Sequence, residues 1–264
     1  MFRALRTAAL GMSAQQLSVD NIANNLANVN TQGYKRTQIA FQDLFYQTLA
    51  ASRMGASANN VSNDSPELQV GHGSRPVATI RNFSQGSMEE SGNPLDLAVN
   101  GIGFFQISRP DGSVAYSRDG SFTLNSQGML VNSSGLPLAD QIEIPQDAVS
   151  IKITQDGNVA AMVQGQNGPV DLGQIELAKF INPGGLRAMG DNLFEATDSS
   201  GDPFLGLPGA EGFGGIMQGF TENSNVDIVN EMVRLIVAQR AYETNSKMVT
   251  TAEEMMGITN SIKR

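Results

Sequence analysis

Few residue combinations in this sequence could support catalysis or bind a metal ion. The 264-residue chain contains one histidine, His72, and no cysteine. A multi-histidine zinc site, a Cys–His catalytic pair and disulfides are therefore excluded. His72 lies between two glycines, and we expect it to be an ordinary loop residue. Adjacent carboxylates such as Glu89-Glu90 and Glu253-Glu254 are expected to be solvated, so no catalytic pair has a usable spacing.

Glycine-containing motifs are better explained as turns than as ligand sites. Gly101-Ile102-Gly103 begins like a dinucleotide-binding loop, but Gln106 stands where the third glycine would be, and the flanking pattern is strand to strand. Asp111-Gly112 and Asp156-Gly157-Asn158 resemble fragments of calcium loops without the further spaced carboxylates. We therefore expect no catalytic residue, no metal site and no cofactor, and a protein that is not an enzyme.

Charge is distributed unevenly along the chain. The net charge is −9, with +3 in residues 1–36, 0 in residues 226–264 and −12 in the remaining middle. An acidic middle argues against a nucleic-acid partner, because phosphate binding needs clustered Lys and Arg. No apolar run approaches the roughly 18 residues of a membrane span.

The first residues, MFRALRTAALGMSA, faintly resemble a signal peptide. Thr7, Gly11 and Ser13 interrupt the apolar run, and a heptad pattern continues straight through it. We therefore expect no cleaved signal peptide, so that export would need another route.

Glycine and proline divide the chain into three parts. All ten prolines lie between Pro66 and Pro208, and only three of 28 glycines fall in residues 1–36 and 226–264. Both residue types disfavour helix interiors. Long helices are therefore predicted at the two ends and not in the middle.

Each end carries a heptad pattern. In the first segment, apolar residues recur every seven positions in two registers that form an a/d seam. The first register is Leu5, Met12, Val19 and Leu26, and the second is Ala8, Gln15, Ile22 and Val29. In the last segment the main row is Ile228, Leu235, Tyr242, Val249 and Met256, and the companion row is Ala238, Asn245, Ala252 and Thr259. Narrow a/d seams favour helix–helix packing, although two amphipathic helices covering a globular core would show a similar pattern.

The middle of the chain predicts β structure. Short apolar–polar alternations are separated by Asp-Gly, Gln-Gly and Ser-Gly turns, and the strongest hairpin is VSIKITQDGNVAAMV with Asp156-Gly157 in its turn. Such spacing suggests a small sandwich or barrel. The predicted fold class is α+β: long N- and C-terminal helices pairing as a coiled-coil-like domain, and a central all-β domain of short strands. The predicted division is 1–36 with 221–264 for the helical assembly domain, 37–75 for an extended connecting segment and 76–220 for the β domain.

Three long motifs, taken together, identify a family. DNIANNLANVNTQGYKR (20–36), the central stretches LDLAVNGIGFFQI and YSRDGSFTLNSQGMLV, and SNVDIVNEMVRLIVAQRAYETNSKMVTTAEEM (224–255) resemble bacterial flagellar rod and hook proteins. The stretches AFQDLFYQTL and VGHGSRPVATIRNFSQG are most similar to distal rod subunits, and a proximal rod subunit is the alternative.

The resemblance implies a structural subunit that polymerises helically into a hollow, rigid rod, which transmits torque from motor to hook and passes exported subunits. It implies self-association, with proximal rod proteins, the hook protein, the surrounding P- and L-ring proteins and the flagellar type III export apparatus as further partners. It places the protein in the basal body, in the rod that spans the periplasm. It also suggests that residues 46–70 brace neighbouring subunits; a surface loop is the alternative.

From the seam and the resemblance, two sets of residues are candidates for assembly. The seam is expected to be buried only when subunits associate, because an isolated amphipathic helix is marginal in water. Its members are Leu5, Met12, Val19, Ile22, Leu26, Val29, Ile228, Leu235, Tyr242, Val249 and Met256. The family-motif turn contributes Asn28, Asn30, Gly33 and Tyr34.

The turn is expected to end the first helix, with Gly33 as its C-cap and Lys35 and Arg36 beside the terminal carbonyls. Gln15 and Asn245 are polar at seam positions, and either fix the register or face a wet channel wall. A secreted adhesin with a coiled-coil stalk and a peptidoglycan-cleaving enzyme are alternative classes, but neither has a ligand patch or catalytic pair in this sequence.

Overall fold

A computed structural model describes residues 2–50, 68–165, 168–210 and 212–262. The chain divides into two compact units, which we describe separately. The helical unit comprises residues 1–24, 37–80 and 229–264, and the β unit comprises residues 25–36 and 81–228. The α+β class predicted from the sequence is confirmed by two long terminal helices and a strand-rich centre.

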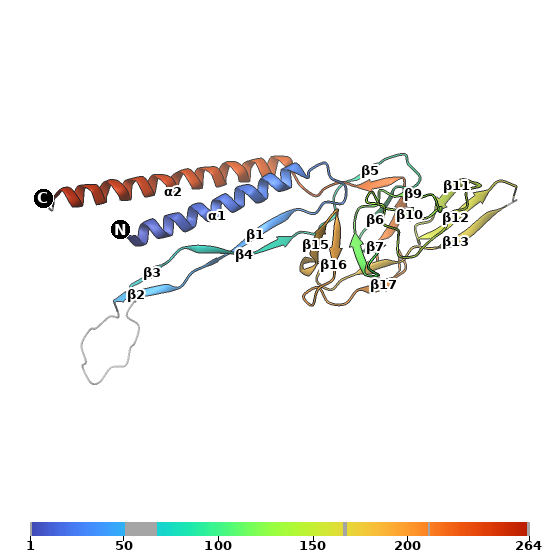
Figure 1. Ribbon diagram of the computed structural model, residues 1–264, viewed down its shortest axis with the longest axis horizontal. Coiled ribbons are helices and arrows are strands. Elements are labelled where there is room, and N and C mark those ends of the chain that lie inside the picture. Colours follow the sequence, from blue (N-terminus) through green and yellow to red (C-terminus); the bar gives the residue numbers. More distant parts are fainter. Residues whose placement is uncertain (1, 51–67, 166–167, 211, 263–264) are drawn as a thin grey trace, which may run out of the picture. The chain divides into compact units, whose positions relative to one another are not determined.

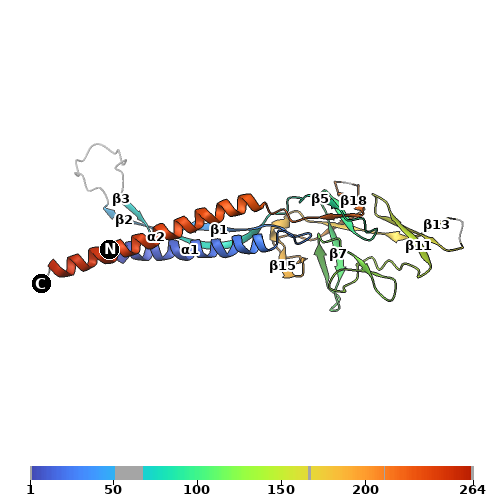
Figure 2. The same cartoon turned by 90° about the horizontal axis from the view of Figure 1, so that it is seen from above.

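The helical unit contains the two helices at the chain ends. Helix α1 spans Phe2–Ala27 and helix α2 spans Ile228–Ile262. All of α2 from Val229 onward belongs to the helical unit. They lie side by side and antiparallel (Figures 1 and 2). Neither helix contains proline, and each contains one glycine, so little in their sequences opposes a continuous helix.

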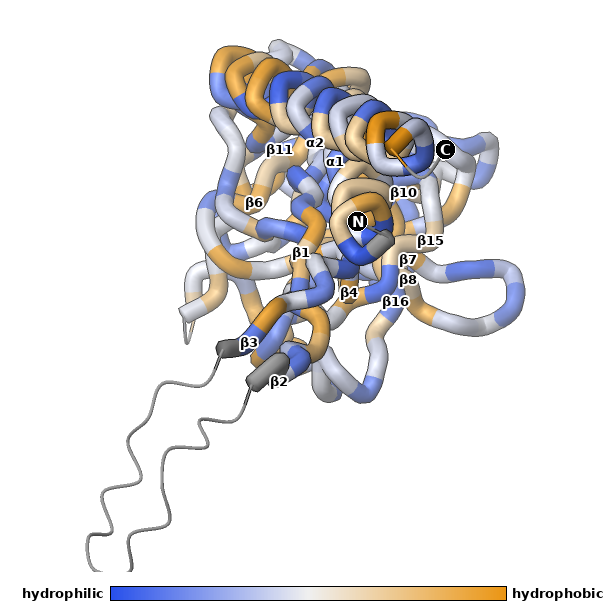
Figure 3. The backbone as a smooth tube through the Cα atoms, turned by 90° about the vertical axis from the view of Figure 1, so that its left-hand side faces the viewer, coloured by the Kyte–Doolittle hydropathy of each residue, from blue (hydrophilic) through white to orange (hydrophobic). Residues whose placement is uncertain are grey.

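A β-ribbon of two short antiparallel pairs completes the helical unit. Its strands are β1 (Thr37–Asp43) paired with β4 (Ser74–Arg81) and β2 (Tyr46–Ala50) paired with β3 (Leu68–Gly71). Figures 1 and 3 show the ribbon and α2 on opposite sides of α1. Asn21 of α1 donates a hydrogen bond to Thr37 Oγ1 at 2.8 Å, and a Cβ on Gly73 would touch Thr7 and Leu10. Helix α1 is therefore the middle layer of this unit.

The sequence pattern predicted an extended segment in this region but not the pairing within it. The suggested brace, residues 46–70, extends over residues 51–67, which lie outside the described part of the chain. His72 follows β3, where its Nδ1 lies 3.0 Å from the carbonyl oxygen of Phe45.

The β unit is built from several small sheets rather than the single sandwich or barrel that the strand spacing suggests. Its largest sheet has six strands in the order β15-β16-β8-β7-β14-β17. These strands are β7 (Phe104–Ser108), β8 (Val114–Ser117), β14 (Leu177–Lys179), β15 (Arg187–Gly190), β16 (Leu193–Glu195) and β17 (Phe204–Gly206). Each of these six strands has only three to five residues, which is short for a strand of a globular protein.

The remaining strands form a three-stranded sheet and three two-stranded pairs. The three-stranded sheet joins β11 (Ala148–Ile153), β12 (Asn158–Val163) and β13 (Pro169–Gln174). The pairs are β6 (Leu97–Asn100) with β18 (Gly215–Gln218), β5 (Met88–Glu90) with β19 (Phe220–Glu222), and β9 (Thr123–Leu124) with β10 (Leu130–Val131). The predicted β11–β12 hairpin is confirmed, and Gly157 in its turn has φ +81°, a conformation that favours glycine.

Two apolar clusters hold the β unit together. The larger gathers aliphatic residues with Phe105 and Phe122, whose rings meet edge to face at 5.3 Å. The smaller is aromatic: Phe104, Phe180 and Phe194 pack with Tyr116 and with the partly buried Phe83. Burying such rings contributes roughly 1.5–3 kcal/mol each, so the β unit has a core of its own.

Candidate functional site: the terminal helices and a buried charge cluster

The predicted seam residues of α1 lie on one face but are only partly covered. Ile22 is buried, whereas Leu5, Met12, Val19 and Leu26 are half-buried. Val29 lies beyond the end of the helix, which stops at Ala27. The fully buried positions of α1 besides Ile22 are occupied by the small residues Ala8 and Ala14 and by Asn25.

Helix α2 shows the same division between small buried residues and large uncovered ones. Leu235, Val249 and Met256 are half-buried, and Ile228 and Tyr242 are exposed. The buried residues of α2 are Glu231, Ala238 and Ala252.

The two helices approach each other closely at Gly11 and Asn245. A Cβ placed on Gly11 would lie 2.9 Å from the Asn245 side-chain nitrogen. Val19 and Tyr242 line a cavity of about 370 Å³ in the same unit. The structure thus places seam residues of both helices together, and leaves space between their large side chains.

A second apolar face on α2 was not part of the predicted seam. Val229, Val233, Ile236 and Val237 are all exposed, and their spacing places them opposite the buried Glu231 and Ala238. Apolar colouring recurs along α2 in Figure 3. The heptad pattern did not indicate this face, because its residues lie outside the a and d positions.

The turn after α1 differs from the prediction. The helix ends at Ala27, so Gly33 is not its C-cap. Gly33 has φ +67°, its N–H donates to the carbonyl of Glu222 at 2.8 Å, and a Cβ there would lie 2.6 Å from the backbone nitrogen of Asp119. Glycine is required at this position because the chain turns in a left-handed conformation against another backbone.

The other turn residues have distinct environments. The Tyr34 hydroxyl donates to Asn25 Oδ1 at 3.1 Å, and Asn28 Oδ1 accepts from the Thr31 hydroxyl at 3.2 Å. Asn30 is exposed. The side chains of Asn28 and Tyr34 thus hold the turn in shape through local hydrogen bonds.

Lys35 is buried in a charge cluster and does not cap helix α1, which corrects the prediction for this residue. Its Nζ lies 2.5 Å from Glu222 Oε1 and donates to the Ser84 carbonyl at 2.9 Å. Arg118 Nη1 lies 3.5 Å from the other Glu222 oxygen, and its guanidinium donates to the carbonyls of Val99 and Gly101. We call Lys35, Arg118 and Glu222 the charge cluster.

Two cations share one carboxylate in this cluster, which therefore holds an excess positive charge. All three side chains are almost fully buried. Burial lowers the pKa of Lys35 even though Glu222 opposes the shift, and burial likewise lowers the pKa of Arg118. Removing Glu222 would leave both cations uncompensated in a region without water access.

The cluster joins the segment that follows α1 to the segment that precedes α2. Glu222 ends strand β19, and its carboxylate also accepts the Gly86 N–H at 2.8 Å. Three residues later, Asn225 Oδ1 accepts the Arg36 N–H at 2.7 Å, and its amide donates to the carbonyls of Asn82 and Ser84. Within the β unit, side chains therefore fix the segment that follows α1 to the segment that precedes α2.

Neither membrane-spanning helices nor metal-ligand clusters were found among the described residues. No helix there is long and apolar enough to cross a membrane. No group of three or more His, Asp or Glu side chains in the same part of the chain is arranged to hold a metal ion.

Three family models match this chain. A flagella basal body rod protein model matches residues 5–35, a flagellar hook protein FlgE/F/G D1 domain model matches 98–161, and a flagellar basal body rod FlgEFG protein C-terminal model matches 217–262. The chain is 48% identical to the flagellar basal-body rod protein FlgG of Borreliella burgdorferi, over the full length of both chains. It is 47% identical to the FlgG of Caulobacter vibrioides over 99% of both chains. It is 34% identical to the rod protein FlgF of the same organism over 93% of both chains.

The chain belongs to the FlgG family of flagellar basal-body rod proteins. Its predicted function as a structural subunit of the flagellar distal rod is thereby confirmed, and FlgG-family proteins are structural proteins rather than enzymes. The matched regions include the seam of α1, the turn and all of α2.

Some important residues of this FlgG-family chain were missed by sequence reasoning. Arg118 and Glu222 lie far from Lys35 in sequence, and Gly11 was noted only as an interruption of an apolar run. One signal was available: Lys35 and Arg118 both occur inside family motifs, and a charged residue that is buried needs a partner of opposite charge. Sequence spacing does not identify that partner.

Proposed function

We propose that copies of this FlgG-family chain polymerise helically through their terminal helices into a hollow, rigid rod that transmits torque and passes exported subunits. In this proposal, the helices within residues 1–36 and 221–264 form a coiled-coil-like assembly domain, residues 37–75 connect it, and residues 76–220 contribute most of an outer β domain. Family membership supports polymerisation within the basal body.

The observation that carries the proposal is the incomplete burial of the apolar side chains of both terminal helices. Leu5, Met12 and Val19 are half-buried, and Val229 and Val237 are exposed. Roughly 25 cal/mol is gained for each Å² of apolar surface removed from water, so neighbouring copies that cover these side chains would be strongly favoured. The β unit, by contrast, already has two buried apolar clusters.

The charge cluster supports the mechanical part of the proposal. The chain passes between the two units at 24/25, 36/37, 80/81 and 228/229, and torque from the terminal helices enters the β unit through residues 25–36 and 223–228. The hydrogen bonds of Glu222 and Asn225 fix these two segments to one another, and buried ion pairs of this kind resist displacement because separating them leaves buried charge.

The proposed partners follow from the family rather than from any contact of this chain. They are proximal rod proteins, the hook protein, the P- and L-ring proteins and the type III export apparatus, with the rod spanning the periplasm and the subunit exported without a cleaved signal peptide. Self-association is the part of the proposal that can be tested with variants of this chain.

The test is a pair of double variants with the same added charge. Met12→Asp with Val19→Asp places two carboxylates in the seam of α1 within the helical unit, and Ala9→Asp with Ser13→Asp places two at exposed positions of the same helix. Basal bodies are isolated from a strain carrying each variant and viewed by electron microscopy. We expect the seam variant to give no distal rod while its β unit still unfolds at the wild-type temperature, and the control to build rods. Normal rods from the seam variant would contradict the proposal.

A further inference from the structure

One arginine of the β unit is partly buried without an anion. Arg81 ends strand β4, and its guanidinium carbon lies 5.1 Å from the centre of the Phe194 ring. Its side chain has no ion pair or hydrogen bond with any residue that the structure describes. Burial lowers the pKa of Arg81, as expected for a guanidinium that has lost water without gaining a carboxylate.

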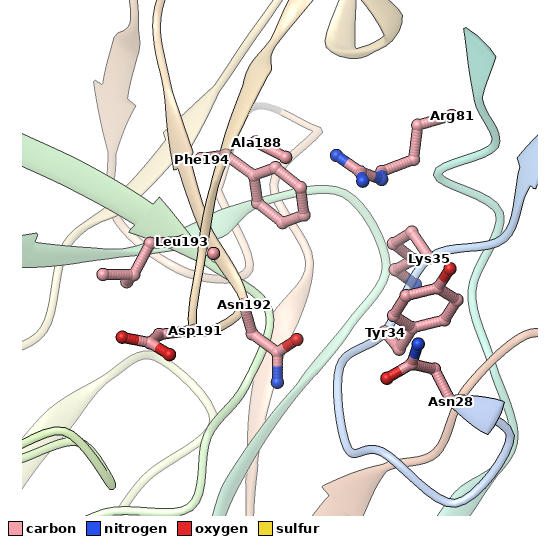
Figure 4. A pocket seen from close by; sticks show the side chains of 10 residues that line it. Asn28, Tyr34, Lys35, Arg81, Ala188, Asp191, Asn192, Leu193 and Phe194 are labelled. Atoms are coloured by element: carbon pink, nitrogen blue, oxygen red, sulfur yellow. The ribbon is translucent and has the colours of Figure 1, made fainter. Parts of the chain in front are cut away.

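The Arg81 guanidinium projects into a pocket of about 200 Å³, which we call the Arg81 pocket. Asn28 and Tyr34 of the family turn form one wall, and the β15–β16 hairpin with Asn192 and Phe194 forms the other (Figure 4). Asn192 has φ +57°, and its amide donates to the Gln32 carbonyl at 3.0 Å, which fixes this wall to the turn.

The charges that line the Arg81 pocket favour an anion near Arg81. Lys35 also lines it, but its Nζ is engaged by Glu222 and Ser84. The acidic group in the lining is Asp191, which Figure 4 shows across the pocket from Arg81. The charge cluster behind the turn adds one excess positive charge.

We propose that the Arg81 pocket binds a carboxylate side chain presented by a second copy of the chain. A guanidinium has a planar pair of N–H donors that matches a carboxylate, and the Phe194 ring holds that plane in place. The volume suits one acidic side chain rather than a larger ligand. This proposal rests on the proposed function, because it requires copies to associate.

The chain's own composition identifies the source of the carboxylate. The β unit contains 18 Asp and Glu against 8 Lys and Arg, so a neighbouring copy presents a high density of carboxylates. The same acidic surface repels nucleic acid and other polyanions. An open assembly needs a contact between two different patches, and an arginine pocket with a distant carboxylate forms such a pair.

The first experiment identifies the carboxylate in the Arg81 pocket by cross-linking it covalently to residue 81. Arg81→Lys supplies a primary amine, and a carbodiimide then joins that amine to a carboxylate in contact with it. Rods are assembled from a mixture of ¹⁵N-labelled and unlabelled chains, and the coupled peptides are identified by mass spectrometry. We expect mixed-isotope pairs between Lys at position 81 and an Asp or Glu of another copy, in rods but not in monomers. Coupling only within one chain, for example to Asp191, would overturn the proposal.

A second experiment measures the contribution of the contact to assembly. We expect Arg81→Gln to raise the protein concentration needed for polymerisation at least tenfold, because a charge-assisted contact is lost, and Arg81→Lys to raise it less. The matched control is Arg187→Gln, on the same hairpin, where an exposed arginine pairs with Glu195; it should change this concentration less than twofold.

The outcomes separate the two proposals. If the wild-type chain forms rods and Arg81→Gln polymerises at the same protein concentration, the proposed contact at the Arg81 pocket is rejected, and the proposal of helical polymerisation stands. Binding of free acetate or phosphate to the monomer at millimolar concentration, without intermolecular coupling in rods, would show a small-anion site and also reject the pocket as a contact between copies. Failure of the wild-type chain to polymerise would reject both.

Discussion

Lys35 Nζ lies 2.5 Å from Glu222 Oε1, and both side chains are fully buried, although 187 residues separate them in the chain. The first residue follows α1 and the second precedes α2. The ion pair therefore joins the two chain segments that connect the β unit to the terminal helices.

Replacing Glu222 with Gln is expected to destabilise the β unit strongly. The variant keeps the shape of the side chain but leaves Lys35 and Arg118 buried without a counter-charge, which costs about 3–5 kcal/mol. The free energy of unfolding can be measured by urea titration, using tyrosine fluorescence because the chain has no tryptophan. The control, Glu90→Gln at an exposed position, should stay within about 0.5 kcal/mol of wild type. A loss below about 1 kcal/mol for Glu222→Gln would contradict this reading of the cluster.

Gly33→Ala tests why the family turn needs glycine. The new Cβ would meet the Asp119 backbone at 2.6 Å in addition to adopting a positive φ. Gly112 also has a positive φ, but no atom of the described residues lies within 4 Å of a Cβ at that position, so Gly112→Ala isolates the cost of the conformation, about 1–2 kcal/mol. We expect Gly33→Ala to lower the free energy of unfolding by at least about 1 kcal/mol more than Gly112→Ala, because a backbone must also shift. Equal losses would mean that the close approach is unimportant.

The contact between Gly11 and Asn245 can be tested by a double-mutant cycle. Alanine at Gly11 crowds the Asn245 side chain, and Asn245→Ala should relieve that crowding, giving a favourable coupling of about 1 kcal/mol. Thermal unfolding followed by the helical circular dichroism signal measures it. Gly257→Ala is the control, because a Cβ at that position would contact none of the described residues, and it should stabilise α2 by about 0.5–1 kcal/mol. Strictly additive effects at Gly11 and Asn245 would place the two helices farther apart in solution.

Asp140 predicts a pH dependence of stability. Burial, and secondarily the nearby Glu176, raise its pKa to about 6, although its carboxylate accepts the Glu176 N–H at 3.1 Å. The folded state then holds this proton more tightly than the unfolded state, so the stabilisation is complete below the unfolded pKa of 3.8 and is lost as the pH rises through about 6.

Asp140→Asn should therefore raise the free energy of unfolding near pH 7.5, by about 1–2 kcal/mol once the partial solvent exposure of the site is considered, and should have little effect near pH 4. Urea titrations at both pH values measure the difference. Asp147→Asn, at an exposed position, provides the comparison and should change the value by no more than about 0.5 kcal/mol at either pH. An Asp140→Asn effect that is the same at both pH values would contradict the raised pKa.

Local periodicity and turn chemistry were enough to determine much of this protein from its sequence. The heptads beginning at Leu5 and Ile228 predicted two long helices, and Asp156-Gly157 predicted the β11–β12 hairpin. The family resemblance followed from motifs at both ends and in the centre, because those motifs are contiguous in the chain.

Tertiary structure decided the relationships between distant residues. The partners of Lys35, the end of α1 at Ala27 and the approach of Gly11 to Asn245 all depend on which backbone segments meet in space. The physical reason is one of range. Helix and turn preferences act within a few residues, whereas a buried charge or a missing Cβ is explained only by an atom that folding brings from elsewhere in the chain.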